Sequence, residues 1–287
     1  MFCAATQAAL RAFQADRGLG SSGRCDRHTW AALVEASWAF GDRILVLMSP
    51  NMRGDDVAEL QSRLARLGFD AGRVDGIFGP ATMRALEAFQ ANCGLVVDGV
   101  CGAKTVRIVV RVGSQSGQGP GIAALREREQ LRVGPGSLAR CRAVVGQFGG
   151  LSALTRAITR ELRLRGATVM SLDEPDGVAQ AAAANHFGAD VYMGFESTLE
   201  ATAVVHYYQV PTFESVGGHA LADAMAEQLR LVPLAAMTQG MRLPVLRETR
   251  MTAVVAALGP ARTIGNLTPQ VATHVLVALE AWASRAG

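Results

Sequence analysis

The sequence predicts an α/β protein in which all-helical repeats precede a mostly parallel six-stranded sheet flanked by helices. Two observations lead to this fold class. The first third of the chain contains an internal repeat with apolar residues at helical spacing, and beyond residue 137 short β-rich runs alternate with helical ones. A segment rich in Gly, Ser, Gln and Pro lies between them. The expected divisions are a partial repeat at 1–46, a second repeat at 47–111, a linker at 112–137 and an α/β domain at 138–287.

The composition is that of a folded protein. The chain has 287 residues, long enough for two domains that each bury a core, and its 49% hydrophobic residues exclude the disordered class. The net charge of +3 is not gathered into a basic run, so we expect no nucleic-acid partner. No run approaches the ~18 apolar residues of a membrane-spanning helix, so we expect no membrane span.

The N-terminal segment and the cysteines both bear on localisation. Residues 1–19 interrupt their apolar residues with charged and amide side chains, unlike the unbroken apolar core of a secretory signal. The five cysteines form no CxxC pair and are odd in number, which is typical of reduced thiols. These features predict a cytoplasmic protein.

The repeat appears when the chain is shifted by 76 positions against itself. Ala-Phe-Gln-Ala at 12–15 then matches 88–91, and the same register continues through glycine, cysteine and threonine positions. Chance does not keep one register over this length. The first copy enters its repeat midway, because Met1 aligns with Ile77, and we expect that Met1 is not the natural start of the chain.

The second copy predicts two helices joined by a turn. Asp55 or Asp56 can cap the first helix, and Gly68 is placed to end it. A turn over 70–79 leads to Pro80 at the start of the next helix. Each helix has one apolar face, formed by Val57, Leu60, Leu64 and Leu67 in the first and by Ala85, Leu86 and Phe89 in the second.

Residues 74–82, Val-Asp-Gly-Ile-Phe-Gly-Pro-Ala-Thr, together with Ala-Phe-Gln at 88–90, resemble the type 1 peptidoglycan-binding repeat. The resemblance covers residues 54–109 and implies a three-helix module with a shallow groove for glycan or stem peptide. The candidate ligand-binding residues are Asp75, Gly76, Phe78, Thr82, Phe89, Gln90, Asp98 and Gly99. Phe89 and the glycines are better explained as core and turn residues, so the resemblance supports the fold more strongly than the binding.

The C-terminal region predicts six strands and four helices. Alternation of this kind is typical of a mostly parallel sheet covered by helices on both faces. Within the preceding linker we expect a short helix over 122–131. The expected strands are 143–145, 168–171, 191–195, 204–208, 243–246 and 253–256, and the expected helices are 151–164, 178–186, 219–229 and 269–284.

This region resembles the zinc-dependent type 3 N-acetylmuramoyl-L-alanine amidases over residues 141–285. The landmarks are Asn185 with Gly-Ala-Asp at 188–190, and Leu-Pro-Val-Leu-Arg-Glu-Thr at 243–249. In that family zinc is held by a His in a Gly-His-Gly-Gly loop, by a Glu, and by a second His in a Ser-x-His-Ala-Asn segment. A further Glu acts as general base. The resemblance implies these roles for the matching positions.

The matching positions lack this chemistry. Phe148 stands at the first His position and cannot bind zinc, Glu196 stands at the second, and Ala257 stands at the position of the general base. The loop that should supply the Glu ligand is shortened, since 151–153 lead directly into a helix, and Glu161 lies too deep in that helix. No histidine pair has a ligand spacing such as HExxH. We therefore predict no metal, no cofactor and no catalytic residue.

Peptidoglycan-binding repeats followed by an amidase domain without its zinc residues resemble the actinobacterial CwlM-like family. The resemblance implies a non-catalytic cytoplasmic regulator or scaffold of peptidoglycan biosynthesis. Its partner would be a protein of that pathway, with peptidoglycan or its precursors as candidate ligand. The alternatives are a wall-binding or wall-cleaving amidase, which would need export and a metal site, and a structural remnant without a ligand. We also expect Phe148, Phe195 and Ala257 to line the former active face as an apolar floor for a partner.

Overall fold

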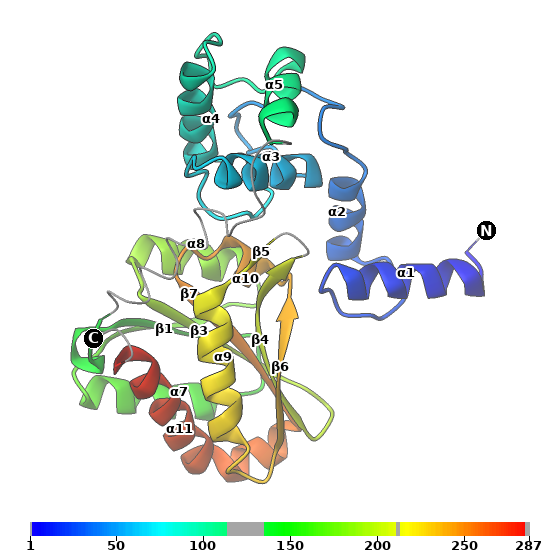
Figure 1. Ribbon diagram of the computed structural model, residues 1–287. Helices are drawn as coiled ribbons and strands as arrows, with labels where there is room; N and C mark the ends of the chain where they lie inside the picture. The colour runs from blue at the N-terminus through cyan, green and yellow to red at the C-terminus, as the bar shows by residue number, and fades with distance from the viewer. Residues whose placement is uncertain (1, 114–134, 211–212, 285–287) are drawn as a thin grey trace. The chain divides into compact units, whose positions relative to one another are not determined.

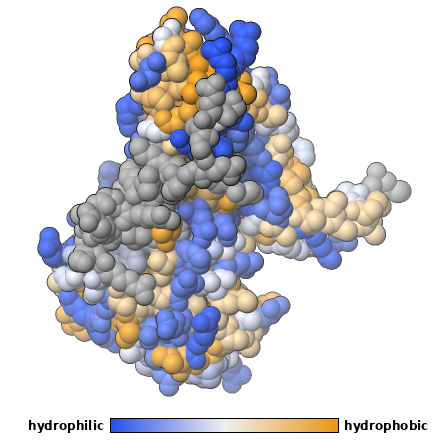
Figure 2. All heavy atoms as spheres, viewed as in Figure 1, coloured by the Kyte–Doolittle hydropathy of each residue, from blue (hydrophilic) through white to orange (hydrophobic). Residues whose placement is uncertain are grey.

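The computed structural model describes residues 2–113, 135–210 and 213–284 (Figure 1). The described residues form two compact units, 2–113 and 135–210 with 214–284, and each unit has its own apolar core. Most of the expected linker at 112–137, and the helix expected within it, lies outside the described residues. Within those ranges no helix has the length and apolar content needed to cross a membrane. On the face drawn in Figure 2, hydrophilic and apolar residues are interspersed over the second unit.

The first unit is all-helical, as predicted. The apolar faces of α3, α4 and α5 form one core, in which Leu60, Leu86 and Phe89 are fully buried. The cap expected at Asp55 or Asp56 is wrong, because Gly54 occupies the cap position and both aspartates lie in the first turn of α3. The buried carboxylate of Asp56 instead pairs with the Arg43 guanidinium at 2.7 Å. The helices are α1 (Ala4–Asp16), α2 (Arg27–Ala36), α3 (Asp55–Arg66), α4 (Pro80–Asn92) and α5 (Ala103–Gly113).

A buried glutamine of α4 holds the turn that follows the helix. The Gln90 side-chain oxygen accepts from the backbone N–H of Asp98 at 3.2 Å and of Gly99 at 3.0 Å. Its amide nitrogen donates to the Asp98 carboxylate at 2.8 Å and to the Val100 carbonyl at 3.1 Å. Gly99 has a φ of 66°, a conformation that favours glycine. We call this arrangement the glutamine clamp, because one side chain both accepts hydrogen bonds from N–H groups of the turn and donates hydrogen bonds to its oxygen atoms.

The glutamine clamp occurs in two further places. Gln61 of α3 and Gln14 of α1 are buried like Gln90, and each binds a turn whose central residue is a glycine. In the first repeat a serine replaces the aspartate, and its hydroxyl still accepts from the glutamine amide at 3.3 Å. The partners of Gln61 are Asp75, Gly76 and Thr82, and the partners of Gln14 are Ser22, Gly23 and Thr29.

The second unit is a sheet with helices on both faces. Its strands are β1 (Arg142–Gln147), β2 (Thr168–Asp173), β3 (Val191–Ser197), β4 (Thr202–Val210), β5 (Phe213–Glu214), β6 (Ala235–Met241) and β7 (Thr252–Leu258). Its helices are α7 (Ser152–Leu164), α8 (Gly177–Phe187), α9 (Val216–Leu229), α10 (Pro244–Glu248) and α11 (Ala261–Ser284), and a short 3-10 helix, η1 (Leu138–Arg140), precedes β1.

The strand order is β2-β1-β3-β7-β4-β5, with β6 also paired to β4. β1 pairs in parallel with β2 and β3, and β3 pairs in parallel with β7, whereas β4 runs antiparallel to β7. The sheet is therefore mixed and has seven strands among the described residues, where the sequence predicted six that were mostly parallel. Helices α7, α9 and α11 cover one face with the main core, and α8 packs on the other through Gln180 (Figure 1).

The strand expected at 243–246 is wrong, because these residues begin α10. Pro244 occupies the first helical position, where its fixed φ suits the helix and its missing N–H costs nothing. The N–H of Arg247 donates to the Leu243 carbonyl at 2.9 Å and closes the first turn. An apolar run of four residues does not distinguish a buried strand from a buried helix.

Two strands were missed, and α9 and α11 start three or more residues earlier than expected. β6 contributes only Ala236 to the core, so it lacks the apolar run by which strands were recognised. β5 is only two residues long. α11 begins at Ala261 and contains Pro269, which the sequence analysis placed at its start. Ile264, fully buried in the core, explains why the earlier turns are retained.

We expect Gln90→Leu to destabilise the first unit by about 1–3 kcal/mol, because leucine fills the space but leaves the buried Gly99 N–H without its acceptor. Hydrogen exchange of peptides spanning 83–101 measures the change. Asn92→Ala, an exposed change on the same helix, should alter the stability by less than about 0.5 kcal/mol. Unchanged protection in Gln90→Leu would contradict the role of the glutamine clamp.

Candidate functional site

Three neighbouring strands carry the candidate positions to one edge of the sheet. Because β1, β3 and β7 are parallel, their carboxyl ends meet at the same edge. Glu196 lies opposite Ala257 in the pairing of β3 with β7. Phe148 directly follows β1 and donates its backbone N–H to the Phe195 carbonyl at 2.9 Å. Phe148, Glu196 and Ala257 therefore form a row across adjacent strands, which we call the catalytic row.

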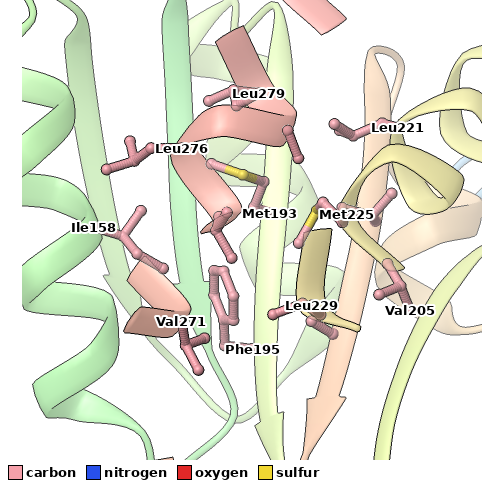
Figure 3. Packing of buried hydrophobic residues seen from close by; sticks show 14 of the residues in the cluster. Ile158, Met193, Phe195, Val205, Leu221, Met225, Leu229, Val271, Leu276 and Leu279 are labelled. Carbon is pink, nitrogen blue, oxygen red and sulfur yellow. The ribbon is translucent and has the colours of Figure 1, made fainter. Parts of the chain in front are cut away.

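The alternation of side chains along β3 separates the catalytic row from the main core. Phe195 points to the opposite face from Glu196, and Figure 3 shows its ring in the apolar cluster with Val271 and Leu229. The expectation that Phe195 lines the former active face is therefore wrong. Its neighbour Glu196 is exposed.

Phe148 packs where two glycines leave room for its ring. A Cβ atom added to Gly194 would lie 3.1 Å from the Phe148 ring, and one added to Gly177 would lie 3.7 Å from it. The ring thus contacts β3 and the first residue of α8, and Phe148 is half-buried. An aromatic side chain occupies the space in which the family resemblance placed a zinc ligand.

Beside the catalytic row, a buried hydrogen-bond network ties α8 to the sheet. The Tyr192 hydroxyl donates to Gln180 Oε1 at 2.8 Å, and the Gln180 amide donates to the Gln147 carbonyl at 2.9 Å. Gly146 makes room for this contact, since a Cβ atom there would lie 2.0 Å from Gln180 Oε1. Burial raises the pKa of Tyr192, so its hydroxyl stays protonated. The network consists of neutral groups and holds the sheet and helix together.

The catalytic row does not fit a zinc ion. A catalytic zinc site takes three nitrogen, oxygen or sulfur ligands from the protein. Phe148 and Ala257 offer none, and Glu196 offers one carboxylate. Across the described ranges no group of three His, Cys, Asp or Glu side chains is arranged to hold a metal ion. His206 lies on the same face of the sheet in β4, where burial lowers its pKa to about 4 and keeps it neutral.

The candidate residues of the peptidoglycan-binding repeat belong to the glutamine clamps and the core. Six of them are buried, and Asp75 and Asp98 are the ones that reach solvent. Hydrogen bonds from the Val100 N–H and from Gln90 lower the pKa of Asp98, so its exposed carboxylate is charged at neutral pH. The buried members are Gly76, Phe78, Thr82, Phe89, Gln90 and Gly99.

Two positioning residues had no assigned role in the sequence analysis. Asn185 donates to the Glu248 carbonyl at 2.8 Å and accepts from the Arg250 N–H at 2.9 Å, which joins the end of α8 to the segment after α10. Gln61 forms its clamp from α3, which lies outside the part of the second repeat that aligns with the first. Gln14 and Gln90 coincide when the chain is shifted by 76 positions, and this match could have indicated a shared role in the two clamps. Gln61 has no aligned position, so the repeat could not indicate its role.

Comparisons with known proteins agree with both units. Residues 1–33 and 53–109 match the family described as a putative peptidoglycan binding domain. The N-acetylmuramoyl-L-alanine amidase CwlM of Mycobacterium tuberculosis is 32% identical over an alignment of 296 positions, which covers 90% of this chain and 72% of that protein. The spore cortex-lytic enzyme of Bacillus cereus is 55% identical over 58 residues, 20% of this chain and 22% of that protein.

Among solved structures, the catalytic domain of the amidase CwlV from Paenibacillus polymyxa aligns with 49% of this chain and 97% of its own length. The identity is 13% and the TM-score is 0.42. The chain therefore combines a region that matches the peptidoglycan-binding domain family with an α/β unit related to that of the M. tuberculosis protein. It belongs to the family of the M. tuberculosis CwlM amidase.

The desolvated carboxyl of Glu196 predicts a dependence of stability on pH. Although Glu196 is exposed, neighbouring protein atoms partly desolvate its carboxyl, which raises its pKa above the ordinary value. The folded protein therefore holds this proton to higher pH than the unfolded chain does. The native state therefore loses stability as the pH rises through this raised pKa. We expect Glu196→Gln to be more stable than wild type at about pH 8, with the advantage disappearing below about pH 4.

Urea-unfolding midpoints across this pH range measure the effect. Glu200→Gln, an exposed glutamate in the loop after β3, is the matched control, and the effect of Glu196→Gln is taken as the difference between the two variants. A difference that does not change with pH would contradict the desolvation of Glu196.

Proposed function

We propose that this chain acts in the cytoplasm as a non-catalytic regulator or scaffold of peptidoglycan biosynthesis, through contact with a protein of that pathway. The observation that carries the proposal is the chemistry of the catalytic row. Phe148 contributes a phenyl ring, Glu196 one carboxylate and Ala257 a methyl group. Zinc-assisted amide hydrolysis needs a ligand set with an open position for water, and a base to take the water's proton. Phe148 and Ala257 provide neither.

The packing around the catalytic row supports a binding role. Met193 and Leu279 are fully buried in the apolar core of the second unit (Figure 3), and Val254 is fully buried in the same core. The second unit therefore keeps a well-packed core although Phe148 and Ala257 carry no reactive group. A scaffold needs a stable surface and no reactive centre. The packed core of the second unit supports this role.

The cysteines support placement in a reducing compartment. All five are unpaired. Burial raises the pKa of the Cys101 and Cys141 thiols to about 12, which keeps them protonated and unreactive. Unpaired thiols are typical of proteins that stay in the cytoplasm.

The repeats belong to the same proposal as the part that binds peptidoglycan or its precursors. The charged carboxylate of Asp98 and the half-buried carboxylate of Asp75 are the accessible polar groups of the candidate set. Glycan hydroxyls and stem-peptide amides are hydrogen-bond donors that such acceptors bind. Of the remaining candidates, Phe78 and Phe89 lie in the core, and the others belong to the two turns and their clamps.

The second candidate function is a peptidoglycan-binding N-acetylmuramoyl-L-alanine amidase that acts at the wall. It is favoured by the amidase name of the M. tuberculosis relative and by Glu196, whose carboxylate is a suitable metal ligand. Metal content and activity separate the two candidates.

We expect the purified full chain to bind no stoichiometric zinc and to release no muropeptides from peptidoglycan. Loss of a general base alone typically costs about 10²–10⁴-fold in rate, and loss of the metal adds to this. Elemental analysis and a muropeptide-release assay measure the two quantities, with a zinc-containing amidase assayed in parallel. One zinc per chain together with measurable release would establish the amidase instead of the regulator.

A further inference from the structure

A basic groove lies between α7 and the edge strand β2, apart from the catalytic row. Its volume is about 490 Å³, within the range of ligand and peptide pockets. We call it the α7–β2 groove. It is lined by Arg156, Thr159, Arg160, Arg163, Leu164 and Ser171.

The arginines of the α7–β2 groove form a stripe with a net positive charge. Arg156, Arg160 and Arg163 are spaced by four and three residues, which places them on one side of α7. The nearby carboxylate is that of Glu161, which lies 3.4 Å from Arg160 and 3.0 Å from Arg165. Because Glu161 is shared with Arg165, it does not neutralise the stripe. The groove therefore attracts anionic groups.

Ser171 lines the groove from β2, the strand at the edge of the described sheet. Thr168 donates its N–H toward β1, to the Cys141 carbonyl at 3.0 Å. The backbone groups of Val169 and Ser171 consequently point to the other side, where the described residues place no strand. The Val169 carbonyl already accepts from the Arg163 guanidinium at 3.1 Å. The edge of β2 can therefore bind a hydrogen-bond donor from outside the sheet.

We propose that the α7–β2 groove binds an extended acidic segment of a partner protein, which adds to β2 as a further strand. Alternate residues of such a strand are about 6.6–6.8 Å apart. Arg156 and Arg160 are about 6 Å apart along the helix axis, so acidic side chains at every second position face successive arginines. A backbone N–H of the segment replaces Arg163 at the Val169 carbonyl and releases that guanidinium to pair with a carboxylate.

An extended chain fits this groove better than a flat anionic surface does. The hydroxyl groups of Thr159 and Ser171 lie 3.0 Å apart, and Thr159 is buried below the arginines. A strand can reach this floor, and it also covers Leu164, which is 74% exposed. The proposal does not depend on whether the catalytic row hydrolyses peptidoglycan, and its test measures binding alone.

The test uses the full chain and two fluorescein-labelled peptides of about ten residues. One peptide alternates Glu and Thr, and the other has the same composition with its glutamates in one block. Fluorescence anisotropy should show tighter binding of the alternating peptide. Arg156→Glu should weaken that binding about tenfold, whereas Arg262→Glu, the same charge change on exposed residue 262 of α11, should change it less than about twofold.

Ser171→Pro tests the pairing with the strand edge. Proline removes the outward N–H of residue 171 and is tolerated on an edge strand, so the variant should fold and bind the alternating peptide about tenfold more weakly. Circular dichroism checks the fold, and if this variant is unfolded, the comparison of the two peptides decides the question.

Three results would overturn the proposal. Arg156→Glu and Arg262→Glu could weaken binding equally, which would indicate a diffuse charge effect. The two peptides could bind alike, which would exclude strand addition. Vesicles containing phosphatidylglycerol could bind in an Arg156-dependent way while the alternating peptide does not, which would assign the groove to a membrane surface.

Discussion

The parallel pairing of β3 with β7 is the constraint on which the candidate site depends. It places Glu196 beside Ala257 and, through the contact of Phe148 with the Phe195 carbonyl, aligns three strand ends. A shift of one residue would bring Phe195 to the catalytic face and bury a carboxylate in the apolar core. Phe195 and Met193 fill the space against α9 and α11 and so oppose such a shift. Packing of Met193 and Phe195 on one face of the sheet thus determines which side chains, Glu196 among them, lie on the other face.

The sequence was sufficient for features that follow from local patterns. Two helices of the first unit, α3 and α4, and five of the strands could be predicted, because apolar spacing, glycine and proline positions act over a few residues. The strand expected at 243–246 failed because a proline-initiated helix and a buried strand share the same short apolar run. Matching motifs did not show which face of the sheet the Phe195 side chain lies on. Alternate residues of a strand face opposite sides, so the answer depends on the strand pairing, which the motifs do not contain.

The glutamine clamps explain why the altered first repeat still folds locally as the second does. The turn requires a donor and an acceptor from one buried side chain, and a glycine at a positive φ, as at Gly23 and Gly99. Replacing aspartate by Ser22 retains a polar partner for the glutamine amide. It removes the carboxylate that Asp98 presents to solvent in the second repeat. The two repeats therefore share the hydrogen bonds that stabilise the turn. They differ in the chemical group that the turn presents to solvent.

The open edge of β2 also affects how copies of the chain behave toward one another. An unpaired strand edge can template pairing between molecules, and natural proteins oppose this with charged residues along the edge. Two copies meeting edge to edge would bring their arginine stripes together, and the carboxylate of Glu161 is already paired with Arg160 and Arg165. The resulting electrostatic repulsion opposes association of two copies through this edge. It weakens as added salt shortens the Debye length, so the protein should be least prone to aggregate through this edge at low ionic strength.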